Sequence, residues 1–185
     1  GESMTSTTKR HPAEMRGRIG CDAQGRITGM EFEGRFNTGA YSSWGPTVAN
    51  RVPVHVSGPY VTPAITASAR AIHTHGPVSG AFRGFGVPQA ALWQETLYDR
   101  LAEKAGIDRL EFRLRNAFRD GDASATGQVL QATGIHPCLM ALKPLTPNLD
   151  IHGGVLVYTF GDTLKAFNNG DTAQVVGTVG LGFSF

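Results

Sequence analysis

The sequence predicts an α+β fold in which a β-hairpin and further strands are followed by two or three helices and then by a β-rich C-terminal tail. Three observations support this prediction. Polar and apolar residues alternate on both sides of a short turn near residue 25, and large apolar side chains recur at helical spacing after residue 88. From residue 146 on, charged residues become rare and seven glycines appear among alternating residues that read as strands.

The N-terminal part is predicted to form the β-hairpin. Residues 15–20 and 26–37 read as two strands separated by the turn Asp22-Ala23-Gln24-Gly25. The second strand has two expected faces, one with Ile27, Gly29, Glu31 and Glu33 and the other with Thr28, Met30, Phe32 and Phe36. Residues 64–75 are small, polar or β-branched, which predicts a further strand that leads into the loop after it.

Two helices are expected after residue 88. The first covers residues 88–105 and ends at Gly106, and its apolar side chains are spaced four apart at Trp93, Leu97 and Leu101. The second starts at Asp108, which forms a capping-box pattern with Glu111. Its buried face is expected to carry Leu110, Leu114 and Phe118.

A glycine-rich loop with the sequence GAFRGFGVPQ, residues 80–89, lies between the predicted strand and the first helix. Gly84 and Gly86 permit positive φ and close backbone approach, and Pro88 presets φ at the first helical position. The free N–H groups of a helix N-terminus point back toward such a loop and favour an anionic guest. The loop is therefore a candidate binding site; an ordinary turn between a strand and a helix is the alternative.

Composition excludes several classes of protein. Lys and Arg number 17 against 15 Asp and Glu, and the basic residues are scattered, so nucleic acid is not an expected partner. No run approaches the roughly 18 apolar residues of a membrane helix, and the first residues have no signal-peptide pattern. We therefore expect a cytoplasmic protein without a membrane partner.

The sequence predicts no metal site. Cys21 and Cys138 are far apart and lack a paired-ligand spacing, which favours reduced structural thiols over zinc or an iron–sulfur cluster. His73 and His75 would share one face of a strand and could bridge a metal, but no third ligand lies nearby in sequence. An exposed or structural pair of histidines is the favoured interpretation.

Several segments together resemble one known family. AFRGFG-x-PQ, at residues 81–89, resembles the cofactor loop in the large, molybdopterin-binding subunit of the xanthine dehydrogenase/aldehyde oxidase family. The resemblance extends over about residues 2–145, with the motifs in the family's order. It includes Lys9-Arg10-His11-Pro12, the turn at residues 25–29, GIDRLEFRLRN at 106–116 and TGQVL at 126–130.

The resemblance implies a cofactor site in the loop, formed by Ala81, Phe82, Arg83, Gly84, Phe85 and Gly86. The resemblance implies that Phe82 to Gly86 lie against the molybdenum end of the cofactor, where backbone N–H groups and Arg83 can stabilise its oxygens. Phe85 corresponds to an aromatic residue that packs against a flat substrate. For Arg83, the alternative is a surface arginine paired with a helix carboxylate.

Arg51 is the candidate catalytic residue. It resembles the arginine that, in the purine-using branch of the family, donates to a substrate carbonyl and stabilises the negative charge that develops during attack. Its neighbour is Asn50, where the family often has a glutamate, so the substrate pocket differs at this point. A solvated arginine in a loop is the alternative.

The implied function is that of a segment of a molybdenum hydroxylase catalytic subunit. This class oxidatively hydroxylates an N-heterocycle such as a purine, or an aldehyde, with water as the oxygen source and a glutamate as general base. Iron–sulfur and flavin modules, with the rest of the catalytic subunit, would be its partners. The family's glutamate motif and GGGFGGK-type loop do not occur in these residues, so the molybdopterin site is incomplete and the isolated chain is expected to lack turnover. The alternative is a non-catalytic remnant or chimeric chain that binds cofactor or partner subunits without turnover.

Two domains are expected. Residues 1–145 would form a partial molybdenum-cofactor-binding domain, and residues 146–185 a β-hairpin tail of uncertain origin. The tail weakly resembles the closing hairpin of an outer-membrane β-barrel, with strands at residues 153–160 and 173–185. The alternatives are an ordinary soluble hairpin and an unrelated tail joined by a frameshift or a chimeric assembly.

Overall fold

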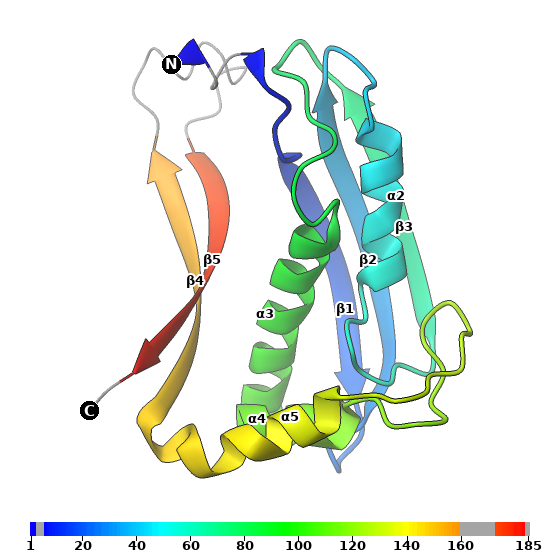
Figure 1. Ribbon diagram of the computed structural model, residues 1–185, viewed down its shortest axis with the longest axis vertical. Coiled ribbons are helices and arrows are strands. Elements are labelled where there is room, and N and C mark those ends of the chain that lie inside the picture. Colours follow the sequence, from blue (N-terminus) through cyan, green and yellow to red (C-terminus); the bar gives the residue numbers. More distant parts are fainter. Residues whose placement is uncertain (3–5, 160–172, 184–185) are drawn as a thin grey trace. The chain divides into compact units, whose positions relative to one another are not determined.

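The hairpin expected from the sequence is present in the computed structural model, which describes residues 1–2, 6–159 and 173–183 (Figure 1). Strand β1 (Ala13–Cys21) pairs antiparallel with β2 (Ile27–Gly39). The turn between them places Gly25 at φ 76, a left-handed conformation that favours glycine. An Asx-type turn supports it, because Asp22 Oδ1 accepts the amides of Gln24 and Arg26 at 2.9 and 2.8 Å.

The two faces of β2 follow the predicted alternation except at one end. Met30, Phe32 and Phe36 are buried and the intervening glutamates are exposed, as expected. Ile27 is buried and Thr28 exposed, however, so these two residues lie on the faces opposite to those predicted. The reason is a register shift, since Gly20 pairs with Gly29 while Cys21 pairs with Ile27 and Thr28 is left as an extra residue.

A helix that the sequence analysis did not predict connects β2 to β3. Helix α2 (Gly45–His55) lies between β2 and β3 (Ile65–His73), which runs parallel to β2 and completes the sheet order β1-β2-β3. A parallel pair needs such a crossover connection. Its buried residues Val48 and Val52 face the core. The helix changes the expected order of strands first and helices later, but the fold remains α+β.

Helix α3 (Val87–Ala105) lies with α2 over one face of the sheet (Figure 1). Trp93 packs edge-on against Phe32 of β2 with ring centroids 4.9 Å apart, and an added Cβ at Gly17 would come within 2.5 Å of the indole. The deepest stripe of α3 is shifted by one residue from the prediction, with Leu97 and Leu101 half-buried beside it. It consists of Ala90, Gln94, Tyr98 and Ala102.

Helix α4 (Arg109–Asn116) starts at the predicted N-cap, although the carboxylate of Glu111 pairs with Arg115 and Lys143. Asp108 is its N-cap and accepts the amides of Leu110 and Glu111 at 3.0 and 2.9 Å. At the other end the buried Asn116 accepts the Ile27 amide and donates to the Gly25 carbonyl, both at 2.8 Å, which ties α4 to the hairpin turn. Helix α5 (Ile135–Leu142) packs on α4, and the short 3-10 helix η1 (Lys143–Asn148) follows it.

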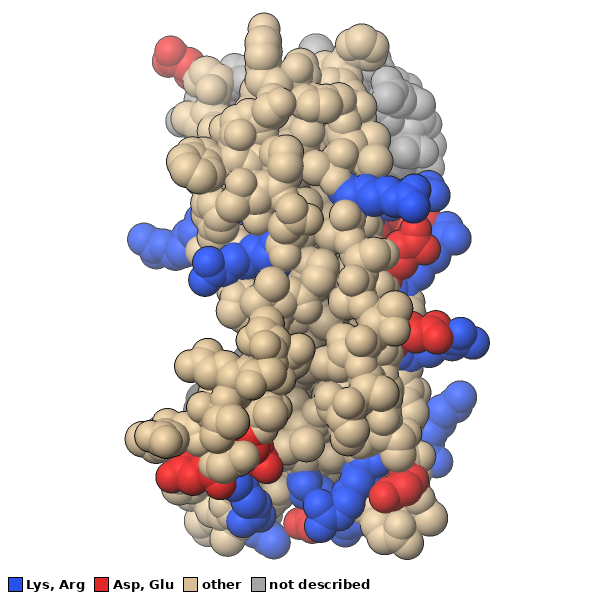
Figure 2. Space-filling model, turned by 90° about the vertical axis from the view of Figure 1, so that its right-hand side faces the viewer, with Lys and Arg blue, Asp and Glu red and all other residues tan. Residues whose placement is uncertain are grey.

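The other face of the sheet is open and carries charged side chains in complementary rows. The register places Glu14 opposite Arg35, Arg16 opposite Glu33 and Arg18 opposite Glu31. Figure 2 shows Lys or Arg and Asp or Glu alternating along one edge of the molecule, beside a broad uncharged area. The helices therefore cover one face of the sheet while the opposite face meets solvent with balanced charge.

The chain divides into two compact units, Gly1–Leu145 and Thr146–Phe185. In the second unit β4 (Leu149–Thr159) pairs antiparallel with β5 (Ala173–Phe183). The polar loop predicted around Asn168-Asn169-Gly170-Asp171 and the terminal Phe185 lie outside the described residues. Within the described ranges, no helix has both the length and the apolar character needed to cross a membrane.

Candidate functional site

The loop at residues 80–86 is a tightly folded turn that leads directly into α3. Gly84 and Gly86 have φ of 86 and 99°, and Phe85 between them has φ 46°. Two internal hydrogen bonds hold this conformation, from the Phe85 amide to the Phe82 carbonyl at 2.8 Å and from the Val87 amide to the Gly84 carbonyl at 2.9 Å. A left-handed Phe costs about 1–2 kcal/mol, and such strain is typical of functional sites.

Most of the backbone N–H groups in the loop are free to donate. Residues 81–84 are exposed, and Gly86 is the N-cap of α3. Among the residues that the structure describes, none accepts a hydrogen bond from five of the loop's amides. The donors are those of Ala81, Phe82, Arg83, Gly84 and Gly86. A loop of this kind suits a ligand rich in oxygen acceptors, because unpaired N–H groups and a helix N-terminus both favour negative charge.

Arg51 lies beside the loop, in helix α2 rather than in the loop expected from the sequence. A Cβ added at Gly86 would lie 2.6 Å from the Val48 carbonyl oxygen and 3.3 Å from the Arg51 Cβ, so glycine is required for this close approach. The exposed guanidinium of Arg51 donates from Nε to His55 Nε2 at 3.1 Å. Burial, and then the charge of Arg51, lower the pKa of His55, which keeps its ring in the neutral form that accepts this bond.

Aromatic side chains lie in and beside the loop. Trp44, which precedes α2, lies edge-on to Phe85 with ring centroids 6.2 Å apart. Trp44 is 58% exposed and Phe82 48%, so two large rings at the loop offer apolar surface. Arg83 is exposed too, and it forms no ion pair with any described residue, so the pairing with a helix carboxylate considered above is not observed.

Arg10, to which the sequence analysis gave no individual role, contacts the loop at three points. Its Nη2 donates to the Arg83 carbonyl at 2.6 Å, and its Nη1 donates to Gln89 Oε1 at 3.3 Å. Its Cζ also lies 4.8 Å from the centre of the Phe82 ring, in a cation–π contact. The sequence analysis noted the KRHP segment as part of the family resemblance. The contact of Arg10 with the loop could not be predicted, because about seventy residues separate them in the chain.

These residues fit a molybdopterin cofactor in part. The molybdopterin cofactor has oxo, pterin and phosphate oxygens, which could accept hydrogen bonds from the free amides, from Arg83 and from the helix N-terminus. The glycines have no side chains to cover the backbone of the loop. Gln89 is 6% exposed and its Nε2 has no partner in the described part of the chain, which leaves one more donor at the base of the loop.

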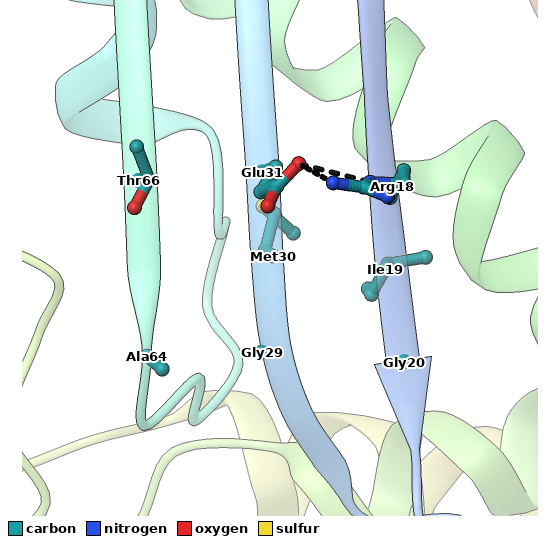
Figure 3. Close-up of a pocket in the computed structure, with 8 residues that line it drawn as sticks. All are labelled: Arg18, Ile19, Gly20, Gly29, Met30, Glu31, Ala64 and Thr66. Atoms are coloured by element: carbon teal, nitrogen blue, oxygen red, sulfur yellow. Dashed lines mark hydrogen bonds and ion pairs between the residues drawn. The ribbon is translucent and has the colours of Figure 1, made fainter.

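Two hollows lie away from the loop. One, of about 430 Å³, is on the open face of the sheet, where Gly20, Gly29 and Ala64 leave space beside the ion pair between Arg18 and Glu31 (Figure 3). The other, of about 550 Å³, lies between α4 and α5 and has a basic lining that includes Arg26, Arg115, Arg119, His136 and Lys143. Neither hollow contains a residue of the loop or Arg51, so the candidate site remains at the loop.

Comparisons with known proteins identify the family of this chain. The chain is 45% identical over 130 residues to the nicotinate dehydrogenase large molybdopterin subunit of Eubacterium barkeri, a match that covers 70% of this chain and 31% of that protein. It is 36% identical over 139 residues to the putative xanthine dehydrogenase molybdenum-binding subunit of Escherichia coli, covering 75% of this chain and 18% of that one. The structure resembles aldehyde oxidoreductase from Desulfovibrio gigas with a TM-score of 0.78 and 29% identity, over 86% of this chain and 19% of that one.

The chain thus spans less than a third of the length of these relatives. The sequence profile of one family, described as the molybdopterin cofactor-binding domain, matches residues 1–117. That range contains the hairpin, α2, β3, the glycine-rich loop, α3 and α4. This chain therefore belongs to the molybdopterin cofactor-binding domain family.

Proposed function

We propose that residues 81–86 and Arg51 form part of the active site of a molybdenum hydroxylase catalytic subunit. The observation that carries this proposal is the adjacency of the loop and α2. Gly86, the last of the five residues with unpaired amides, packs against the Val48 carbonyl and the Arg51 Cβ of α2, and the other four precede it in the same loop. The loop would bind the oxygen-rich cofactor, and Arg51 would face the substrate beside it.

The residues of this chain have distinct roles in the proposed reaction. When bound, the molybdenum cofactor supplies the redox chemistry by which a carbon of the substrate is oxidised with oxygen from water. The loop amides and Arg83 hold and orient that cofactor through its acceptor oxygens. Arg51 stabilises negative charge on the substrate carbonyl, while Phe85 and Trp44 offer apolar ring surface to a flat molecule.

The proposed substrate is an N-heterocycle of the purine type or an aldehyde. A guanidinium next to exposed aromatic rings suits a planar heterocycle with a carbonyl group. The relatives are named for nicotinate, xanthine and aldehyde substrates, which gives the same range of candidates. The general base, the rest of the cofactor site and the electron-accepting iron–sulfur and flavin modules would come from other parts of the enzyme.

A chimeric enzyme tests this proposal. In the nicotinate dehydrogenase large subunit of Eubacterium barkeri, the aligned segment is replaced by the matching residues of this chain, and molybdenum content and substrate oxidation are measured. Gly84→Ala places a methyl group 2.6 Å from Pro88 Cγ and disturbs the loop. Gly121→Ala is the matched control, because Gly121 has a similar φ of 93° and nothing within 4 Å of its added Cβ.

We expect Gly84→Ala to lower the molybdenum content of the folded chimera several-fold, with little change for Gly121→Ala. Equal molybdenum content in both variants would contradict the assignment of the loop. Full cofactor content without oxidation of nicotinate, xanthine or an aldehyde would instead favour the alternative, a segment that binds cofactor without turnover.

A further inference from the structure

Arg10 joins the N-terminal segment to the candidate cofactor loop. One terminal nitrogen of its guanidinium binds the Arg83 carbonyl and the other binds the Gln89 side chain at the start of α3, with the Phe82 ring against the same group. Arginine suits this position because its planar, rigid fork can donate two bonds and stack at the same time.

The backbone on which Arg10 stands is itself fixed. The Lys9 amide donates to the Val78 carbonyl at 3.0 Å, and the Gly80 amide donates to the Lys9 carbonyl at 3.1 Å. On the other side His11 is 3% exposed and packs edge-on to Phe36 in the core. Arg10 is therefore held from both sides and reaches the loop from a rigid segment rather than from a free terminus.

The bond to the Arg83 carbonyl controls the amide that follows it. In a trans peptide group the C=O and the N–H point in opposite directions. With the Arg83 oxygen held by Arg10, the Gly84 N–H must point away from Arg10, and no described residue accepts it. Glycine tolerates both signs of φ, so without this bond the peptide between Arg83 and Gly84 could rotate and replace the donor with an acceptor.

We propose that Arg10 is a positioning residue of the cofactor site, which holds the Arg83–Gly84 peptide so that the Gly84 N–H is presented to an oxygen of the cofactor. This inference rests on the proposed function of the loop. The segment before β1 would thus orient the Gly84 N–H before the cofactor binds. A donor that is already oriented loses less entropy when its ligand binds.

Backbone ¹⁵N relaxation of the 185-residue chain tests the proposal without cofactor. In Arg10→Lys and Arg10→Met we expect the order parameter of the Gly84 amide to fall from the value of a rigid backbone, about 0.85, to below about 0.6. The order parameters of Phe32 and Phe36 in β2 should remain at their parent values. Arg18→Lys is the matched control, because Arg18 is paired with Glu31 on the open face of the sheet.

Two results would overturn the proposal. An unchanged Gly84 order parameter in both Arg10 variants would show that other contacts hold the peptide. A parallel loss at Phe32 and Phe36 in Arg10→Lys would show that Arg10 supports the whole domain rather than the loop. If Arg10→Met does not fold, the milder Arg10→Lys decides between these results.

The molybdenum content of the chimera separates this inference from the proposed function. With both correct, Arg10→Lys lowers the Gly84 order parameter and also reduces molybdenum content several-fold. A lower order parameter with full molybdenum content would confirm that Arg10 orders the loop and would contradict the loop's role in cofactor binding. Reduced molybdenum content with an unchanged Gly84 order parameter would contradict the positioning role of Arg10 and leave the proposed function of the loop intact.

Discussion

Arg51 and His55 lie one helical turn apart, and the contact between them directs the Arg51 side chain. The Nε of Arg51 is engaged by His55, which leaves its terminal nitrogens to meet a substrate. We predict that, in the chimeric enzyme, Arg51→Met lowers kcat/KM for a purine by roughly 10²–10³-fold, the usual loss for one charge-stabilising donor. The loss for an aldehyde should be smaller, because less negative charge is delocalised onto a ring.

Steady-state kinetics on xanthine and on an aromatic aldehyde measure this difference. Arg100→Met, an exposed arginine in α3, serves as the control and should leave both values near those of the parent. An equal loss for the two substrate classes would mean that Arg51 supports the structure of α2 rather than the charge on the substrate.

His11 makes the stability of the domain depend on pH. Its ring is buried against Phe36, its Nδ1 has no partner in the described part, and burial lowers the pKa of its imidazole. Below the ordinary value of about 6.5 the unfolded chain takes up a proton that the folded chain resists. The free energy of unfolding should therefore be highest above that pH and should decrease as the pH falls toward 5.

Urea unfolding at several pH values between 5 and 8 measures this dependence. His11→Gln removes the group and should flatten the curve, although His55, whose pKa is also lowered, leaves a residual slope of the same sign. His75→Gln, an exposed site, retains His11 and should retain the parent slope. A His11→Gln curve as steep as that of the parent would contradict the assignment.

At the scale of single residues, the sequence predicted local backbone conformation better than it predicted contacts between distant residues. The glycine pattern at residues 80–86 indicated positive φ and a bare backbone, and both Gly84 and Gly86 have that conformation. Arg10 could not be connected to the loop by local reasoning, because the contact depends on the pairing of residue 9 with residues 78–80. Long-range contacts of this kind are properties of the folded chain.

The docking of α4 on α3 depends on a buried ion pair. Arg113 of α4 binds Glu95 Oε2 at 2.6 Å and Asp99 Oδ1 at 2.8 Å on α3, and its side chain is only 11% exposed. We predict that Arg113→Met lowers the free energy of unfolding by about 3 kcal/mol, since Glu95 would stay partly buried without Arg113 and Asp99 would keep only the longer contact to Arg109 at 3.6 Å. Chemical denaturation measures this change.

Arg18→Met supplies the comparison for that experiment. Arg18 and Glu31 also form an ion pair, at 2.7 Å, but their side chains are 81% and 56% exposed, so solvent screens the attraction. We expect a loss below about 1 kcal/mol. Similar losses in the two variants would show that burial does not decide the contribution of these pairs.

Helix α4, which has a complete local signal, was predicted, and helix α2, which has a mixed one, was missed. Helix α4 has a capping aspartate and apolar residues at helical spacing within a few positions, so its start at Asp108 was correct. Helix α2 contains Pro53 in its interior, where proline disfavours a helix when judged locally. The helix forms because burial of Val48, Val52 and Val56 on the sheet outweighs that local preference.

At the scale of the whole chain, the order of the motifs indicated the family of the protein, which the periodicity of apolar residues could not do. The motifs follow one another as they do in the resembled family, and the family profile matches residues 1–117. The crossover from β2 to β3 places the loop and α2 side by side, and this topology brings Arg51 to Gly86. Spacing along the chain could not predict that proximity, because the two residues are separated by a strand and its connections.

The separation of the chain at residue 145 leads to the last prediction. Lys143, Pro144 and Leu145 are exposed, and the first unit has its own core around Phe32, Phe36 and Tyr98. We expect a protease to cut first within residues 144–148, the part of the 3-10 helix η1 that spans the boundary between the units, because segments between compact units are the preferred sites of cleavage. Mass spectrometry of the early fragments identifies the position of the cut.

A chain that ends at Leu145 should then unfold cooperatively with nearly the same Tm as the parent, as measured by differential scanning calorimetry. A chain that ends at Gly134 is the control, because it lacks α5 and exposes Leu110 and Leu114, which pack against Leu139. This shorter chain should have a clearly lower Tm. Loss of cooperative unfolding on truncation at Leu145 would instead mean that the strands β4 and β5 belong to the core of the first unit, and the two-domain interpretation would then be wrong.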